Sequence, residues 1–199
     1  MRSGLPVGKI ARRLQIGPTL KTLKVLQRRE NPPGVHGKRR HGAQSVFAQQ
    51  LIEKQKLKFQ FMISEKVLRR AYEAASKKKG GTGDNLVQLL DTRLDATIFR
   101  SGVVRSVLAA RQLITHRHVF VNGKRVDRPS YQIGEQDVIT FSEKALKFTH
   151  VTEGVRDANS VAYVTVDKDN VMIKRSFTPP RSDIPVICNE QMVVEWYSR

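Results

Sequence analysis

The chain has 199 residues, 39% of them hydrophobic, which is enough for one medium domain or two small ones with modest cores. Its 36 Lys and Arg against 18 Asp and Glu give a formal net charge of +18, which a compact protein tolerates best beside a polyanion. No run of 18 apolar residues and no signal-peptide pattern occurs, so we expect no membrane partner. The single Cys188 cannot form an internal disulfide or a cysteine zinc cluster, which fits a reducing compartment.

The positive charge is concentrated at the start of the chain. Residues 1–90 hold 20 basic and 5 acidic side chains, residues 91–150 hold 10 and 6, and residues 151–199 hold 6 and 7. We therefore expect the bulk of the electrostatic contact in the first half, and a structural role for the last fifty residues.

Residues 1–42 mix Gly, Pro and basic residues without a sustained hydrophobic period. So few apolar residues predict a basic arm that is extended and orders on its partner. Two interpretations stay open, a solvated arm or a segment lying on RNA backbone. The close alternation of turn glycines and basic residues favours the second, with Arg39 and Arg40 as phosphate ligands.

Three helices are predicted within residues 43–90, beginning after Ser45, Ser64 and Asp84. The glycines of residues 80–83 follow a helix and lack the Gly-Lys-Ser/Thr ending of a phosphate-binding loop, so they predict a linker. Any single lysine here is best read as part of a solvated face, but positive faces recur on every helix and favour RNA binding. The predicted RNA-binding residues of this part are Lys54, Lys58, Arg69, Arg70, Lys77, Lys78 and Lys79.

Residues 105–131 predict a helix followed by a hairpin. Ser106 can cap a short amphipathic helix, and Asn122-Gly123 supplies the positive φ angles of a tight turn between strands 119–121 and 124–126. Basic side chains are dense around this hairpin, which indicates a phosphate-binding surface. The residues predicted to bind RNA or to shape that surface are Arg93, Arg100, Arg105, Arg111, Gln112, His116, His118, Asn122, Gly123, Lys124, Arg125 and Arg128.

The remaining segments predict a sheet and a final helix. Residues 136–141 are typical of a closing strand, and residues 161–166 and 171–174 of a second hairpin. Asn189 is a candidate cap for a last helix, with a strand as the competing interpretation. The predicted fold class is therefore α+β.

No catalytic constellation stands out in the sequence. His116 and His118 are spaced i, i+2 and lack the i, i+4 pair or acidic companion of a zinc enzyme, and no general acid and base pair can be nominated. We expect no catalytic residue, no metal and no cofactor.

Four short motifs, at residues 93–95, 110–113, 116–121 and 121–124, resemble the small RNA-binding domain of bacterial ribosomal protein four, which also occurs in pseudouridine synthases and other proteins. Further blocks at 31–37, 53–57, 64–66, 80–86 and 189–199 resemble the ribosomal protein four family of bacteria and plastids, in its order and spacing. The similarity runs from about residue 31 to the C-terminus and is weakest over 142–188. The chain lacks the N-terminal cysteines that bind zinc in some members.

This resemblance implies three regions: a basic extended arm (1–42), a helical rRNA-binding domain (43–90) completed by 151–199, and a small RNA-binding domain (91–150). It implies a primary small-subunit rRNA-binding protein that nucleates assembly at a five-way junction, contacts ribosomal protein five, supports decoding accuracy and forms no homo-oligomer. The expected location is the ribosome, in bacterial cytoplasm or plastid stroma. Two alternatives stay open, a pseudouridine-synthase-like RNA-modifying enzyme and an RNA chaperone that recycles stalled subunits.

Overall fold

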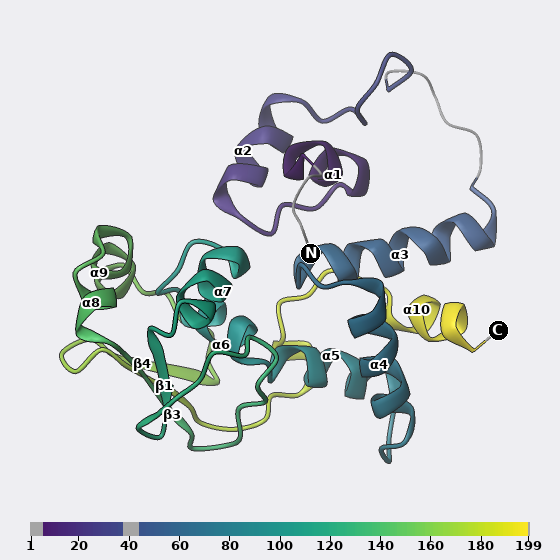
Figure 1. The fold of residues 1–199 in the computed structure, drawn as a ribbon. Helices are drawn as coiled ribbons and strands as arrows, with labels where there is room; N and C mark the ends of the chain where they lie inside the picture. The colour runs from purple at the N-terminus through teal and green to yellow at the C-terminus, as the bar shows by residue number, and fades with distance from the viewer. Residues whose placement is uncertain (1–5, 38–43, 199) are drawn as a thin grey trace. The chain divides into compact units, whose positions relative to one another are not determined.

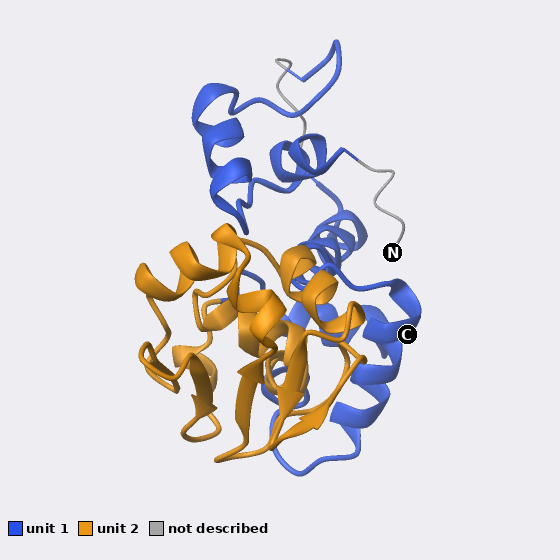
Figure 2. Ribbon diagram, turned by 60° about the vertical axis from the view of Figure 1, so that its left-hand side comes forward, with its two compact units in different colours: residues 1–86, 186–199 blue, residues 87–185 orange. Residues whose placement is uncertain are grey.

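The computed structural model describes residues 6–37 and 44–198, and the chain divides into two compact units (Figures 1 and 2). Unit 1 comprises residues 1–86 and 186–199, and unit 2 comprises residues 87–185. Helices and one antiparallel sheet make up the fold, so the α+β prediction is confirmed. Within the described ranges, none of the helices has the length and apolar character needed to cross a membrane.

The N-terminal arm is helical over most of its described part, which differs from the predicted extended segment. Helix α1 (Val7–Leu14) buries Ala11 and Leu14, and α2 (Leu20–Arg28) begins with a capping box between Thr19 and Thr22. Composition did not predict these helices because the core between them is very small and is supplemented by polar contacts. Arg12 donates from Nε to the Asn31 carbonyl (2.9 Å) and from Nη2 to the next carbonyl of the same loop (3.2 Å). The predicted phosphate ligands Arg39 and Arg40 lie outside the described residues.

The rest of unit 1 is a set of helices closed by the end of the chain. It contains α3 (Val46–Gln60), α4 (Glu65–Ser76), the start of α5 (Thr82–Asp91) and α10 (Glu190–Tyr197). Asn189 accepts the Met192 amide at 3.2 Å, so the helix interpretation of this ending is confirmed.

Helix α10 packs on α3 and α4 through ring contacts and backbone hydrogen bonds. Trp196 lies 4.8 Å from Phe47 between ring centroids, and Tyr197 stacks on Tyr72 at 5.0 Å. The Asn189 amide donates to Glu53 Oε2 at 2.8 Å. These contacts fix the C-terminal helix within unit 1.

Unit 2 is built on a five-stranded antiparallel sheet with the order β2-β1-β3-β5-β4. The strands are β1 (Val119–Val121), β2 (Lys124–Arg125), β3 (Val138–Phe141), β4 (Val164–Asp167) and β5 (Met172–Arg175). Both predicted hairpins therefore belong to one sheet, joined where Ile139 of β3 pairs with Ile173 of β5. Residues 151–185 consequently pack in unit 2, whereas the sequence grouped all of 151–199 with the first-half helices.

Four α-helices and one core complete unit 2. They are α6 (Leu94–Arg100), α7 (Val107–Thr115), α8 (Glu143–Leu146) and α9 (Thr149–Arg156), and a 3-10 turn follows at Arg181–Asp183. Ile98, Ile114, Ile139 and Ile173 are among the fully buried side chains of the core. Gly154 lets α9 pack closely here, because a Cβ at this position would lie 1.9 Å from the Val103 carbonyl oxygen.

Candidate nucleic-acid interface

The turn of the β1–β2 hairpin is fixed by Asn122 and Gly123. Their φ angles of 50° and 76° are those of the left-handed region, as the Asn-Gly pair predicts for a type I′ turn. The Asn122 side chain also donates from Nδ2 to Asp137 (2.8 Å) and accepts the Val138 amide at Oδ1 (2.9 Å). Asn122 thus holds the turn on β3, and the exposed Lys124 and Arg125 follow directly after it.

Helix α7 presents one face to the core and another to solvent. Ser106 accepts the Ala109 amide at 3.2 Å, which confirms the predicted cap. Leu113 and Ile114 are buried, while Gln112 and His116 are exposed. The short helix therefore carries polar side chains beside the hairpin on a rigid support.

Exposed side chains of α7, the hairpin and the loop after it form what we call the α7–hairpin surface. It comprises Gln112, His116, Arg117, Lys124, Arg125 and Arg128. Arg117, which the sequence prediction omitted, forms an exposed ion pair of 3.8 Å with Asp127, a contact worth little in water. The Arg125 guanidinium lies 5.4 Å from the Phe120 ring, which holds its charge at the surface. This surface is positive and its backbone is fixed, so it suits a polyanion.

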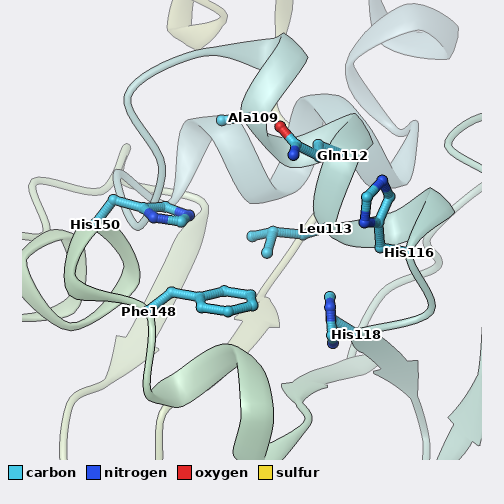
Figure 3. Close-up of a pocket in the computed structure, with 7 residues that line it drawn as sticks. All are labelled: Ala109, Gln112, Leu113, His116, His118, Phe148 and His150. Carbon is cyan, nitrogen blue, oxygen red and sulfur yellow. The ribbon is translucent and has the colours of Figure 1, made fainter.

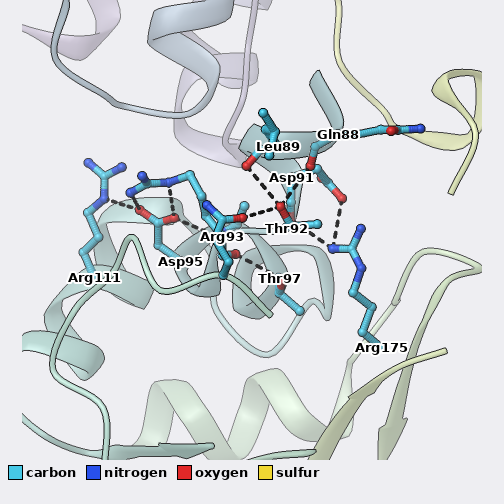
Figure 4. Close-up of polar contacts among 11 residues, drawn as sticks. Gln88, Leu89, Asp91, Thr92, Arg93, Asp95, Thr97, Arg111 and Arg175 are labelled. Atoms are coloured by element: carbon cyan, nitrogen blue, oxygen red, sulfur yellow. Dashed lines mark hydrogen bonds and ion pairs between the residues drawn. The ribbon is translucent and has the colours of Figure 1, made fainter. Parts of the chain in front are cut away.

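Two predicted RNA-binding arginines, Arg93 and Arg111, instead belong to internal ion pairs (Figure 4). Arg93 donates from Nε and Nη2 to the two oxygens of Asp95, each at 3.0 Å, and Arg111 donates from Nε to the same carboxylate at 2.6 Å. Asp95 is 1% exposed, and the Arg93 and Arg111 side chains are 8% and 18% exposed. This network ties the start of α6 to α7 and so positions the α7–hairpin surface.

A second buried carboxylate, Asp91, organises the other end of α6. It accepts Arg100 Nε at 3.1 Å and lies 3.6 Å from Nη1 of Arg175, which is fully buried at the end of β5. Burial and the neighbouring Asp91 charge raise the pKa of Tyr163 above its usual range, so this tyrosine stays protonated. Arg100 therefore links the end of α6 to Asp91 at the end of α5, and it exposes only 12% of its side chain.

Two predicted lysines of unit 1 are likewise engaged inside the protein. Lys54 is 8% exposed, pairs with Glu65 at 3.0 Å and lies 4.3 Å from the Trp196 ring, and Lys58 pairs with Glu65 at 3.2 Å. They share one helix face, as their spacing predicts, but that face is turned to α4 and α10. Burial raises the pKa of Glu65, yet hydrogen bonds from Tyr197 and both lysines outweigh it and leave the pKa below its ordinary value.

The other predicted cations that lie within the described residues are exposed. Arg69, Arg70 and Lys77 to Lys79 lie at the surface of α4 and the turn after it, and Arg69 forms an i, i+4 pair with Glu73 at 3.3 Å. In unit 2, Arg105 is 67% exposed and pairs with Glu153 at 2.8 Å. These charges are accessible to a partner, because exposed ion pairs contribute little and exchange easily with phosphate.

His118 lines a pocket of about 220 Å³ together with α7 and the α8–α9 turn (Figure 3). Its Nδ1 lies 3.0 Å from Ser142 Oγ, and its ring meets Phe148 edge-on at 5.4 Å. Across residues 6–37 and 44–198, no three His, Cys, Asp or Glu side chains gather in a group that could hold a metal ion. Phe148 and His150 were missed by sequence reasoning, since no short helix was predicted around them.

Comparison with known proteins gives similarity over almost the whole chain. Residues 4–91 match the family described as Ribosomal protein S4/S9 N-terminal domain, and residues 92–139 match the S4 domain. The chain is 44% identical to small ribosomal subunit protein uS4 of Paenarthrobacter aurescens over 195 residues, covering 96% of this chain and 95% of the relative. Identity to the proteins of the same name from Pelodictyon phaeoclathratiforme and Streptomyces avermitilis is 42% and 40%, covering 97% and 98% of this chain and 97% of each relative.

Proposed function

The chain belongs to the family of small ribosomal subunit protein uS4, and on this premise we propose that it is a structural component of the small ribosomal subunit that binds ribosomal RNA. The proposal includes the family role inferred from the sequence: binding early in assembly, contact with ribosomal protein five and support of decoding accuracy. Its place is the ribosome, in bacterial cytoplasm or plastid stroma.

The observation that carries the proposal is that some arginines of unit 2 are paired inside the protein while others are exposed. Arg93 and Arg111 share Asp95 inside the protein, while Lys124, Arg125 and other side chains of the α7–hairpin surface remain exposed. A surface whose charges sit on a rigid, internally paired support can match the spacing of phosphates on folded RNA. Recognition of this kind reads shape more than sequence.

We assign the predicted site residues to two roles. Arg93, Arg100 and Arg111 position elements of unit 2, whereas Lys54 and Lys58 hold α3 against α4 and α10 within unit 1. The residues proposed to meet phosphate are Arg69, Arg70, Lys77, Lys78, Lys79, Arg105, Gln112, His116, Arg117, Lys124, Arg125 and Arg128. Arg39 and Arg40 stay in the proposal on sequence grounds alone.

We propose no enzymatic activity for the chain and no homo-oligomer. The match to ribosomal relatives takes in 96% to 98% of the chain, so the family accounts for nearly all of the given sequence. The alternatives of an RNA-modifying enzyme and of a recycling chaperone have no observation in their favour.

Binding of the purified chain to a transcript of small-subunit rRNA tests the proposal. We expect tight binding whose logarithm falls linearly with the logarithm of salt concentration, and stable residence in small subunits through a high-salt wash. Absence of specific binding to the transcript, or residence on free large subunits instead, would contradict it.

A further inference from the structure

The pocket beside α7 has the lining of a site for a flat ring. Phe148, 37% exposed at the start of α9, stacks on His150 with the rings at 12° and their centroids 5.6 Å apart. The His118 ring meets Phe148 edge-on, with an angle of 87° between the rings. In Figure 3, Leu113 of α7 points between these rings. The pocket therefore offers aromatic faces over an apolar floor.

The size and the rim of the pocket narrow the class of ligand. About 220 Å³ is less than the usual volume of a site for a drug-sized molecule, but it holds a single ring system. The exposed Gln112 amide and the His116 ring stand at the rim and can donate and accept hydrogen bonds (Figure 3). Stacking faces combined with polar groups at the edge are how proteins hold unstacked nucleobases.

Charge complementarity favours a nucleotide over an aromatic side chain of another protein. The seven lining residues include no Asp or Glu, and the segments that carry them, residues 105–118 and 142–150, hold five Lys or Arg side chains against one Glu. Of these cations, Arg111 is paired with Asp95 and Arg105 with Glu153. The centres of protein–protein interfaces are depleted in charged residues, whereas binding of single-stranded nucleic acid combines stacking with a positive groove. His116 also belongs to the α7–hairpin surface, so the pocket opens beside the proposed phosphate contacts.

We propose that this pocket binds one unpaired nucleobase of the RNA that lies on the α7–hairpin surface, stacked against Phe148. The inference rests on the proposed function and adds to it a contact with a base. Gln112 and His116 hydrogen-bond the edge of the base, and the small Ala109 leaves the space that the ring occupies. A base so held can be read for its identity, which phosphate contacts alone do not allow.

The test uses the full chain and two single-stranded RNA heptamers, one with 2-aminopurine at its centre and one abasic there. Phe148→Ala should weaken binding of the first heptamer about 5- to 150-fold, the range measured when a stacking aromatic is removed. Phe148→Trp should keep the affinity and quench the 2-aminopurine fluorescence. The matched control is Phe177→Ala, which removes an equally exposed ring (41%) elsewhere in unit 2 and should change affinity less than about twofold.

Two further measurements separate a base contact from a change of fold. Ala109→Leu fills the pocket while Phe148 itself is retained, and it should reproduce the loss seen with Phe148→Ala. Every variant should bind the abasic heptamer with the same low affinity that Phe148→Ala shows for the first heptamer. The salt slope should be the same in all these cases, since the phosphate contacts remain.

The outcomes that would refute the inference differ from those that would refute the proposed function. If the wild-type chain binds both heptamers equally, or if Phe148→Ala and Phe177→Ala behave alike, no base enters the pocket, yet salt-dependent binding of the rRNA transcript still supports the proposed function. If Phe148→Ala leaves binding of the heptamers unchanged and alters only incorporation into small subunits that contain other proteins, the pocket is occupied by a protein side chain and the inference is wrong. Failure to bind the transcript at all refutes the proposed function itself.

Discussion

Replacing Asp95 by Asn should destabilise unit 2, because one carboxylate neutralises two largely buried arginines. Arg93 Nε and Nη2 lie 3.0 Å from its oxygens and Arg111 Nε lies 2.6 Å away, while Asp95 itself is 1% exposed. Removing one partner of a buried ion pair costs about 3–5 kcal/mol, since the remaining charge is left without compensation. The 18% exposure of Arg111 and the oxygen that Asn retains place the expected loss near the lower end, at about 3 kcal/mol.

Urea unfolding of the full chain, followed by far-ultraviolet circular dichroism, measures this loss. For a denaturant slope of about 2 kcal/mol per molar urea, the midpoint should fall by about 1.5 M. Amide hydrogen exchange along α7 should speed up in parallel, because α7 is held to α6 by this network. The matched control is Asp127→Asn, which removes the exposed partner of Arg117 (3.8 Å) and should cost less than about 1 kcal/mol. Equal losses in the two variants would refute the assignment of Asp95 as the support of the surface.

Three further changes test other parts of the molecule. Lys124→Ala with Arg125→Ala should lower the salt slope of rRNA binding by about 0.7 to 0.9 for each lost phosphate contact, and an unchanged slope in filter binding would remove the hairpin from the interface. Glu65→Gln should make the stability of unit 1 depend less on pH in the acid range. Because the folded pKa of Glu65 is below its unfolded value of 4.5, the contribution of Glu65 to stability is present above that pH and is lost as the pH falls through the folded pKa. Acid unfolding of the wild type and of the variant measures the difference. Gly154→Ala should cost about 1–3 kcal/mol in urea unfolding, because the added Cβ meets the Val103 carbonyl, whereas a wild-type stability would mean that α9 can shift without cost.

Local features of the chain were predictable because their causes are local. The caps at Ser45 and Ser106, the Asn122-Gly123 turn and the C-terminal helix follow from side chains a few residues apart, and the structure has each of them. The α+β class follows from the same periodicities.

The roles of individual cations were not predictable, since they depend on carboxylates distant in the chain. Nothing in the sequence around Lys54 indicates that Glu65 and Trp196 enclose it, and Arg111 reads as a surface arginine until Asp95 is placed beside it. The bidentate Arg93–Asp95 pair, two residues apart, is the one such signal that a sequence reading could have used.

The helical arm and the second hairpin show the same limit. Arg12 reaches carbonyls about twenty residues away, and no rule of composition anticipates hydrogen bonds of that kind. Residues 161–166 and 171–174 were predicted as a second hairpin, but strand β5 of that hairpin pairs with β3, and this long-range pairing places the hairpin in unit 2.

The pairing of β3 on both sides determines where this chain can be cut. The S4 domain match ends at residue 139, inside β3, yet β3 binds β1 along one side and β5 along the other. A fragment ending there, or at residue 150, would expose the N–H and C=O groups of β3 that now pair with β5. An unpaired strand edge can pair with other chains and cause aggregation. We therefore expect that an excised piece must extend to Pro185, the end of unit 2, to keep β3 paired on both sides, and that a fusion joint belongs beyond that residue.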